Sequence, residues 1–277
     1  MEMGRTKLSG AAWSWVGTTL HEAAQIWRTL GINAMDLIAF PAAGAGLTTI
    51  EDDPLGTAKT VQKPGIELAN LLYVFGADFQ DRAVNSPGAE VREKNRDAME
   101  RVVEFCSEAG IPSVIILPGV DHDGMTHADS LKLAAEGLVE LTAVGESAGI
   151  QVLFEPHKES VLESPQESLA FLKEYSELGI VLDHSHFVVN GFGHNDVDPL
   201  IPYAGHIHLR QAKNGHLQCV WEDGEIDYPS IIEQLKEVNY DGYIAFEYEN
   251  DPWLDLVDVM TETIKMRDAI LPQISGE

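Results

Sequence analysis

The feature that most constrains the fold is a regular alternation of short apolar runs with longer stretches of helical periodicity. The apolar runs are rich in aliphatic and β-branched residues and lie at residues 8–15, 32–40, 68–75, 112–117, 150–154, 180–182, 205–209 and 243–246. Helical periodicity is clearest at residues 20–30, 91–109, 131–148, 165–178, 229–238 and 254–270. Because strands that are apolar on both faces need helices on both sides, this rhythm predicts a parallel sheet built from βα units.

Glycines stand where expected helices give way to strands. Four of them follow a helical stretch and come just before an apolar run: Gly31, Gly110, Gly149 and Gly179. This is the position at which glycine closes a helix. Eight apolar runs separated by helical stretches, several of which end at a glycine, predict a single (β/α)8 TIM barrel. This α/β fold would span residues 1–277 as one domain. Three irregular stretches follow expected strands, where such barrels build their active sites: residues 41–65, 76–88 and 187–202.

Composition narrows the classes of partner. The chain has 45 Asp and Glu against 18 Lys and Arg, and its net charge of −27 opposes a nucleic-acid backbone or an anionic membrane surface. Cys106 and Cys219 lie far apart and outside any disulfide or zinc-binding spacing. The first ten residues lack an apolar signal core, and no apolar run approaches the roughly 18 residues that span a membrane. We therefore expect a cytoplasmic protein that acts on a small molecule, with neither nucleic acid nor membrane as a partner.

Four acidic or histidine residues stand at the ends of the last four expected strands: Glu155, Asp183, His208 and Glu247. Their separations of 28, 25 and 39 residues are about one βα unit each, so a closed barrel brings the four side chains to one rim. A single Glu or Asp at a strand end is more often a helix cap or a solvated residue, but four in this arrangement predict a metal site. Three carboxylates and one imidazole suit Mn²⁺ best, with Mg²⁺ or Co²⁺ as alternatives.

Further side chains in or near these segments are predicted to bind the substrate: His186, Arg210, His122 and Trp15. His157, two positions after Glu155, is another expected contact. Each has an ordinary alternative, because a histidine beside a strand is more often structural, an arginine neutralises carboxylates and a tryptophan packs in the core. His206 lies two residues before His208, so both side chains point to the same side of the strand and His206 could line the barrel. We interpret His206 as a packed core residue rather than a substrate contact.

Several motifs resemble those of the xylose-isomerase-like barrel superfamily of sugar isomerases and epimerases. They are AspHisSerHis at 183–186, HisIleHis at 206–208, GlyGluIleAspTyrProSerIleIle at 224–232 and AspGlyTyrIleAlaPheGlu at 241–247. The resemblance covers essentially the whole chain. It implies that Glu155, Asp183, His208 and Glu247 bind the metal and that His186 contacts the substrate. In members that resemble ketose 3-epimerases, the two ligand glutamates also move the proton, so Glu155 and Glu247 are the expected catalytic pair.

Two positions depart from the epimerase pattern. Val161 stands where a further substrate-binding Glu is expected, and Asn214 stands where an Arg is expected. GluProHis at 155–157 instead resembles the large subunits of bacterial C-glycoside deglycosidases, in which a histidine near the metal is the base for β-elimination from a 3-keto sugar. That resemblance implies His157 as a catalytic base and a small partner subunit.

The sequence thus predicts a metal-dependent keto-sugar isomerase or epimerase that removes a proton next to a metal-bound carbonyl. The alternative is a metal-dependent lyase that cleaves C-glycosides of 3-keto sugars. Either a homo-oligomer or a small accessory subunit is compatible with the chain.

Two other classes of protein are disfavoured. DNA-repair endonucleases of the same superfamily need extra histidines after the second and third strands, and the chain has no His between His21 and His122. Its net charge of −27 also opposes DNA binding. The second class is a non-catalytic sugar-binding barrel. Metal binding distinguishes it from an enzyme, because in such a barrel we expect the cluster of carboxylates to bind no metal.

Overall fold

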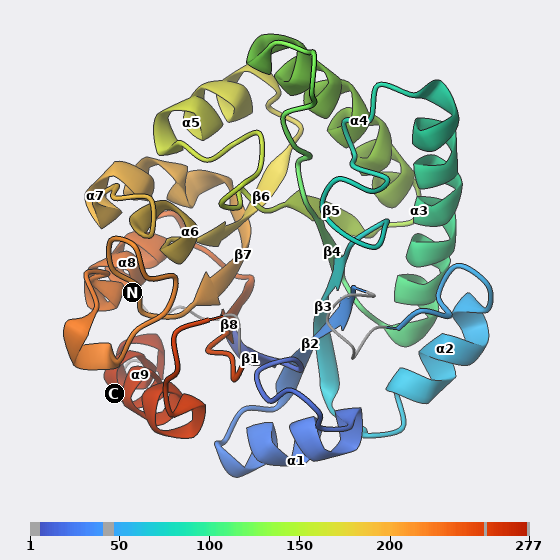
Figure 1. The fold of residues 1–277 in the computed structure, drawn as a ribbon. Coiled ribbons are helices and arrows are strands. Elements are labelled where there is room, and N and C mark those ends of the chain that lie inside the picture. The colour runs from blue at the N-terminus through green and yellow to red at the C-terminus, as the bar shows by residue number, and fades with distance from the viewer. Residues whose placement is uncertain (1–5, 41–46, 252–253, 276–277) are drawn as a thin grey trace.

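Eight parallel strands pair in sequence order, and the last closes on the first, as Figure 1 shows. They are β1 (Lys7–Ala11), β2 (Ala34–Ala39), β3 (Glu67–Tyr73), β4 (Ser113–Ile116), β5 (Gln151–Phe154), β6 (Gly179–Asp183), β7 (Ala204–Leu209) and β8 (Tyr243–Phe246). This computed structural model describes residues 6–40, 47–251 and 254–275. The predicted single (β/α)8 barrel is confirmed.

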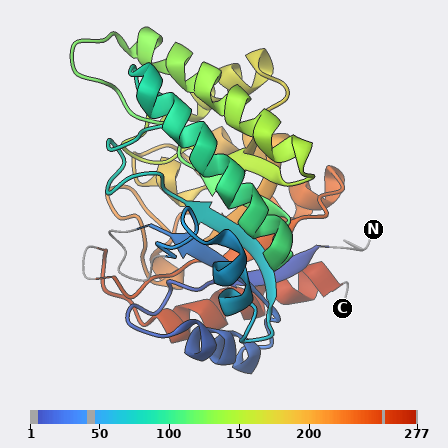
Figure 2. The same ribbon diagram turned by 90° about the vertical axis from the view of Figure 1, so that its right-hand side faces the viewer.

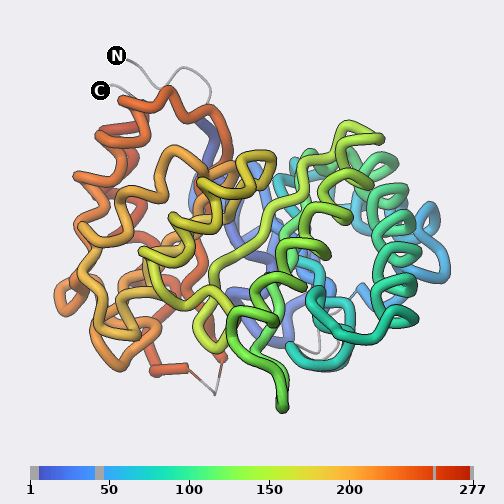
Figure 3. The backbone as a smooth tube through the Cα atoms, turned by 90° about the horizontal axis from the view of Figure 1, so that it is seen from above, coloured from blue at the N-terminus to red at the C-terminus, as the bar shows by residue number. Residues whose placement is uncertain are grey.

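Helices surround the strands on the outside of the barrel (Figure 1). The longer ones are α1 (Leu20–Thr29), α2 (Pro54–Val61), α3 (Ala89–Ala109), α4 (His127–Ser147), α5 (Pro165–Glu174), α8 (Tyr228–Glu237) and α9 (Val259–Ser275). Figures 2 and 3 show α3 and α4, of 21 residues each, side by side. Four short helices follow β6 and β7: α6 (Ser185–Val188), α7 (His194–Val197) and the 3-10 helices η2 (Asp198–Tyr203) and η3 (Trp221–Asp223). Within the described residues, none of the helices combines the length and the apolar character needed to cross a membrane.

Helix α2 is an element that the sequence reading missed, because it lies inside the stretch 41–65 that was expected to be irregular. Its residues include a glycine and two threonines, which are poor helix formers. The helix begins at a local signal instead. The Asp53 side chain accepts a hydrogen bond from Gly56 N, and Pro54 occupies the first helical position.

The predicted ends of other elements need smaller corrections. Strand β1 ends at Ala11 and not at residue 15, and the last helix begins at Val259 and not at residue 254. Three of the four helix-closing glycines have the expected left-handed backbone, with φ angles of 79°, 76° and 73° at Gly31, Gly110 and Gly149. Gly179 is different, since it opens β6 five residues after α5 has ended.

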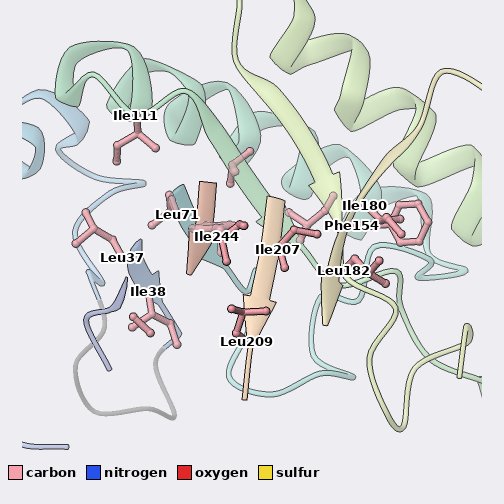
Figure 4. Close-up of a cluster of buried hydrophobic side chains, with 14 of the residues drawn as sticks. Leu37, Ile38, Leu71, Ile111, Phe154, Ile180, Leu182, Ile207, Leu209 and Ile244 are labelled. Carbon is pink, nitrogen blue, oxygen red and sulfur yellow. The ribbon is translucent and has the colours of Figure 1, made fainter. Parts of the chain in front are cut away.

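Side chains of the strands alternate between two environments. Those that point outward pack against the helices, and Figure 4 shows several of them: Leu37, Leu71, Phe154, Leu182, Ile207, Leu209 and Ile244. Inside the barrel, Ile115, Leu153 and Val181 form a small apolar cluster of their own. Successive side chains of a strand point to opposite sides, so every second residue points inward. Glu155 and Asp183 are therefore the next inward-pointing residues after Leu153 and Val181. The barrel interior therefore leads directly to the predicted ligands.

Gly10 in β1 should tolerate no side chain, because a Cβ at this position would overlap the fully buried ring of Trp27. We expect Gly10→Ala to lower the free energy of unfolding by about 2–3 kcal/mol, as overpacking in a core does. Urea denaturation measures this change. Gly88→Ala is the matched control, since its Cβ would meet Val91 at 3.6 Å and should cost below about 1 kcal/mol. Equal losses in both variants would contradict the argument.

Candidate metal and substrate site

The last four strands bring four buried acidic or histidine side chains to the C-terminal end of the barrel. Glu155 follows β5, Asp183 ends β6, His208 lies in β7 and Glu247 follows β8. All four are at most 4% exposed. His208 Nδ1 lies 3.1 Å from Glu155 Oε1 and 3.1 Å from Glu247 Oε2. The ligand atoms of these three residues lie within 4.8 Å of one another, a spacing at which one cation could contact them all.

Asp183 is placed somewhat differently from the other three. Its ligand atom groups within 4.8 Å of those of Glu155 and His186. The neighbouring Arg210 explains this arrangement, because its Nη2 lies 2.8 Å from Asp183 Oδ2 and 3.2 Å from Glu247 Oε2. The guanidinium thus bridges two of the predicted ligands. Glu155 belongs to both groups of ligand atoms, one with His208 and Glu247 and one with Asp183 and His186. The structure thus brings the four predicted ligands close together, but not all four around one position.

Arg210 also binds a third carboxylate that sequence reasoning missed. Its Nη1 lies 2.7 Å from Glu249 Oε1. Burial raises the pKa of Glu249 to about 8, against the lowering effect of Arg210. Even without Glu249, the two buried carboxylates of Asp183 and Glu247 face this one guanidinium, so they outnumber the arginine charge at this point. Such an excess favours the binding of a further cation.

A second group that the sequence did not reveal lies beneath His208. Asp36 of β2 is fully buried, and its Oδ2 lies 2.6 Å from His206 Nε2 and 3.5 Å from His208 Nε2. Burial acts to raise the pKa of Asp36, but the two histidines outweigh it and lower the pKa below its ordinary value. The three residues form another group of ligand atoms within 4.8 Å. The available signal was a lone Asp in an apolar strand, which is buried only where it has a partner.

His208 lies between these two sets of carboxylates. Burial acts to lower its pKa, yet Glu247, Asp36 and Glu155 together raise the pKa well above its ordinary value. The ring therefore holds positive charge unless a metal ion competes for the same carboxylates. A carboxylate behind a histidine ligand fixes the orientation of the ring. Asp36 is placed to do this while Nδ1 faces Glu155 and Glu247.

A cavity of about 400 Å³ opens above the cluster. Six of the predicted site residues line it: Trp15, Glu155, His157, His186, Arg210 and Glu247. Asp183 and His208 are buried and are not part of its lining. A cavity of this volume falls in the range of about 300–1,000 Å³ that small-molecule sites occupy. Carboxylates, imidazoles and a guanidinium thus meet in one space that a small molecule can enter.

His157 is oriented within the cavity wall by the backbone. Its Nδ1 faces the Lys158 carbonyl oxygen, which can only accept, so Nδ1 carries the hydrogen and Nε2 keeps a free lone pair. Burial lowers the pKa of His157 and outweighs the opposite effect of Glu155. The ring centroid lies 3.9 Å from that of His186. The neutral ring can therefore accept a proton at Nε2.

His122 is the predicted site residue that lies apart from the others. It is not among the residues that line the cavity, and its Nε2 lies 3.0 Å from both the backbone O and Oδ1 of Asn85. Asn85 is fully buried and also donates to Val120 O at 2.7 Å. This contact joins the loops that follow β3 and β4. The substrate-binding role of His122 stays a prediction.

The fold and the site define a TIM barrel with a cluster of acidic and histidine side chains at the C-terminal mouth of its last four strands. The sequence profile described as Xylose isomerase-like TIM barrel matches residues 24–269, and the chain belongs to this family.

Two curated relatives and one solved structure illustrate what the chain is similar to. The inosose dehydratase of Clostridium perfringens is 25% identical over 223 residues, which cover 69% of this chain and 74% of that protein. The 2-oxo-tetronate isomerase of Pectobacterium atrosepticum is 27% identical over 187 residues, which cover 60% of this chain and 69% of that protein. The structure of L-ribulose 3-epimerase superposes with a TM-score of 0.74 at 15% identity, over 98% of this chain and 95% of that chain. This last likeness shows a shared fold.

Proposed function

We propose that the chain is a divalent-metal-dependent enzyme that isomerises or epimerises a keto-sugar by removing a proton next to its carbonyl. One observation carries the proposal: the ligand atoms of Glu155, His208 and Glu247 converge beside a cavity of about 400 Å³. The similarity to an isomerase and a dehydratase supports an enzyme of this general class.

The residues present fit a divalent cation. Glu155, Asp183, His208 and Glu247 would hold it, and their three carboxylates and one imidazole suit Mn²⁺, our preferred ion, as well as Mg²⁺ or Co²⁺. Glu247 Oε2 is buried and has ionic neighbours but no hydrogen bond, a condition that a bound cation relieves. When bound, the cation would stabilise the negative charge that develops on the substrate oxygen as the neighbouring proton leaves.

We assign the transfer of the proton to two side chains of the protein. Glu155 and Glu247 both line the cavity, and we assign one as the base that takes the proton and the other as the acid that returns one. His186 and Arg210 line the same space and would bind substrate hydroxyl or carbonyl oxygens. All four side chains are at most 4% exposed and line the cavity, so a substrate that fills the cavity would displace the water around them.

A second candidate is β-elimination from a 3-keto glycoside, which breaks the bond to the aglycone. The observation that favours it is the orientation of His157, whose Nδ1 is held by the Lys158 carbonyl so that Nε2 can act as a base in the cavity. Both reactions begin with loss of a proton next to a carbonyl. They differ in the next step, which is either return of a proton or departure of the group on the neighbouring carbon.

Solvent-deuterium exchange followed by NMR tests the shared first step. The Mn²⁺-loaded protein would be incubated in D₂O with a panel of ketoses, keto-inositols and 3-keto glycosides. We expect deuterium to enter at the carbon next to the carbonyl of at least one compound. Release of an aglycone that stops in His157→Ala would select elimination over isomerisation. No exchange with any compound, in protein shown to contain metal, would contradict the proposed function.

Asp36→Asn should weaken metal binding although Asp36 is not itself an assigned ligand. The amide keeps the size of the side chain but loses the charge that orients His208, so we expect the dissociation constant for Mn²⁺ to rise about 10- to 100-fold. Isothermal titration calorimetry measures it. Ser113→Ala is the control, because Ser113 is also buried in the barrel but bonds Asn70 at 2.7 Å. An unchanged constant in folded Asp36→Asn would exclude the orienting role.

A further inference from the structure

The cavity above the site has two halves of opposite chemistry. Its charged and histidine side chains come from residues at or after the ends of β5 to β8, among them Glu155, His157, His186, Arg210, Glu247 and Glu249. The side chains that line it from β1 to β4 and the loops after them are apolar, among them Trp13, Trp15, Ile38, Phe40, Val74 and Phe79. Among the described residues of that half, Thr18 is the polar exception. The division follows the order of the strands around the barrel.

The apolar half, which we call the apolar wall, contains aromatic rings that reach the histidines of the other half. Phe40 and Phe79 are stacked with their centroids 5.6 Å apart. The rings of Phe79 and His157 form a T-shaped pair with their centroids 5.1 Å apart, and the ring centroids of His157 and His186 are 3.9 Å apart. On the other side of the wall, Trp15 packs on the buried Trp27 at 4.9 Å. A planar group that lies against Phe79 is therefore placed beside His157.

A free sugar covers only part of the apolar half. One C–H face of its ring can pack on an aromatic side chain, but the hydroxyls around the ring lose their water against the rest of the wall without gaining a partner from its side chains. A planar apolar group gains from the same wall, because its surface leaves water and its face stacks on aromatic rings. The cavity of about 400 Å³ lies within the range for ligands larger than a single sugar.

We propose that the substrate is a keto-sugar that carries an aromatic substituent, and that this aglycone binds against Phe79, Phe40 and Trp15. The keto-sugar ring then faces Glu155 and Glu247. The sugar half of this statement rests on the proposed function. The aglycone half rests on the apolar wall and names a part of the substrate that the cluster of carboxylates does not determine.

Paired probes test the proposal. Each pair consists of the methyl and the 4-nitrophenyl glycoside of one 3-keto sugar, made for the gluco, galacto and xylo series, so that only the aglycone differs. Calorimetric titration into the Mn²⁺-loaded protein should show the aryl member of at least one pair binding about tenfold or more tightly than the methyl member. Equal affinities within every pair, or no binding of any aryl member, would overturn the proposal.

Variants of the wall connect the effect to its residues. Phe79→Ala and Trp15→Ala should each reduce the aryl-to-methyl affinity ratio several-fold, because the loss falls mainly on the aryl probe. Phe79→Leu serves in place of Phe79→Ala if that variant fails to fold. Leu217→Ala is the matched control, since Leu217 lines the cavity outside the apolar half and should leave the ratio unchanged. A ratio that no wall variant changes would contradict the assigned position of the aglycone.

Deuterium exchange on the same samples separates this proposal from the proposed function. Selective binding of the aryl probe without exchange at the sugar would contradict the proposed reaction and support the aglycone site. Exchange in at least one pair, with equal rates and affinities for the two members of every pair, would support the reaction and contradict the aglycone site.

Discussion

Glu155→Gln is expected to lower the rate of solvent-deuterium exchange by a factor of about 10³ or more, because the amide can neither take up the proton nor bind a cation as a carboxylate does. The fold should persist, since glutamine has the same shape and Glu155 lies at the edge of the cavity. Metal content, measured by mass spectrometry after dialysis, should fall together with the rate.

The control for this variant is Glu167→Gln. Glu167 lies on α5 and pairs with His127 at 2.9 Å, where both side chains are partly exposed, so its loss should leave the exchange rate nearly unchanged. Wild-type exchange and full metal content in Glu155→Gln would remove Glu155 from both of its assigned roles.

Arg210→Met is expected to lower the free energy of unfolding of the metal-free protein by about 3–5 kcal/mol. The guanidinium is 3% exposed and contacts Asp183, Glu247 and Glu249, so its removal leaves buried carboxylates without their cation. Mn²⁺ should restore part of the loss, because a ligand that binds only the folded state stabilises it. Urea denaturation in EDTA and in excess Mn²⁺ measures both effects.

Lys213→Met is the matched comparison for Arg210→Met. Lys213 forms a more exposed ion pair with Asp223 at 3.0 Å, and such pairs contribute about 0–1 kcal/mol. A metal-free Arg210→Met protein as stable as the wild type would mean that the carboxylates do not depend on Arg210. Stability that Mn²⁺ leaves unchanged would argue that no cation binds among them.

The positions of the strands and of the four assigned ligands could be predicted from the sequence for the same physical reason. Strands buried on both faces must be continuously apolar, so their ends are visible, and parity then fixes which following residues point inward. Glu155 and Asp183 could be placed in this way. Helix α2 could not, because its residues carry little helical propensity and its start depends on Asp53 as a cap.

The groups that support the ligands were harder to foresee. Asp36 and His206 are 170 residues apart, and their contact exists only once β2 and β7 face each other across the closed barrel. Glu249 is similar, because it follows β8 whereas its partner Arg210 follows β7. Pairing within the interior depends on side-chain directions across the barrel, which a single sequence does not display. The sequence therefore indicated the four residues of the proposed metal site but not the charge network that surrounds them.

Anomalous diffraction from crystals soaked in Mn²⁺ would test the central claim most directly. We predict one strong peak within about 2.0–2.3 Å of Glu155, Asp183, His208 Nδ1 and Glu247, with Arg210 displaced from the two carboxylates that it now bridges. The structure also contains the competing group of Asp36, His206 and His208. A peak at that group, or no peak at either, would contradict the assignment of the four residues as the metal site.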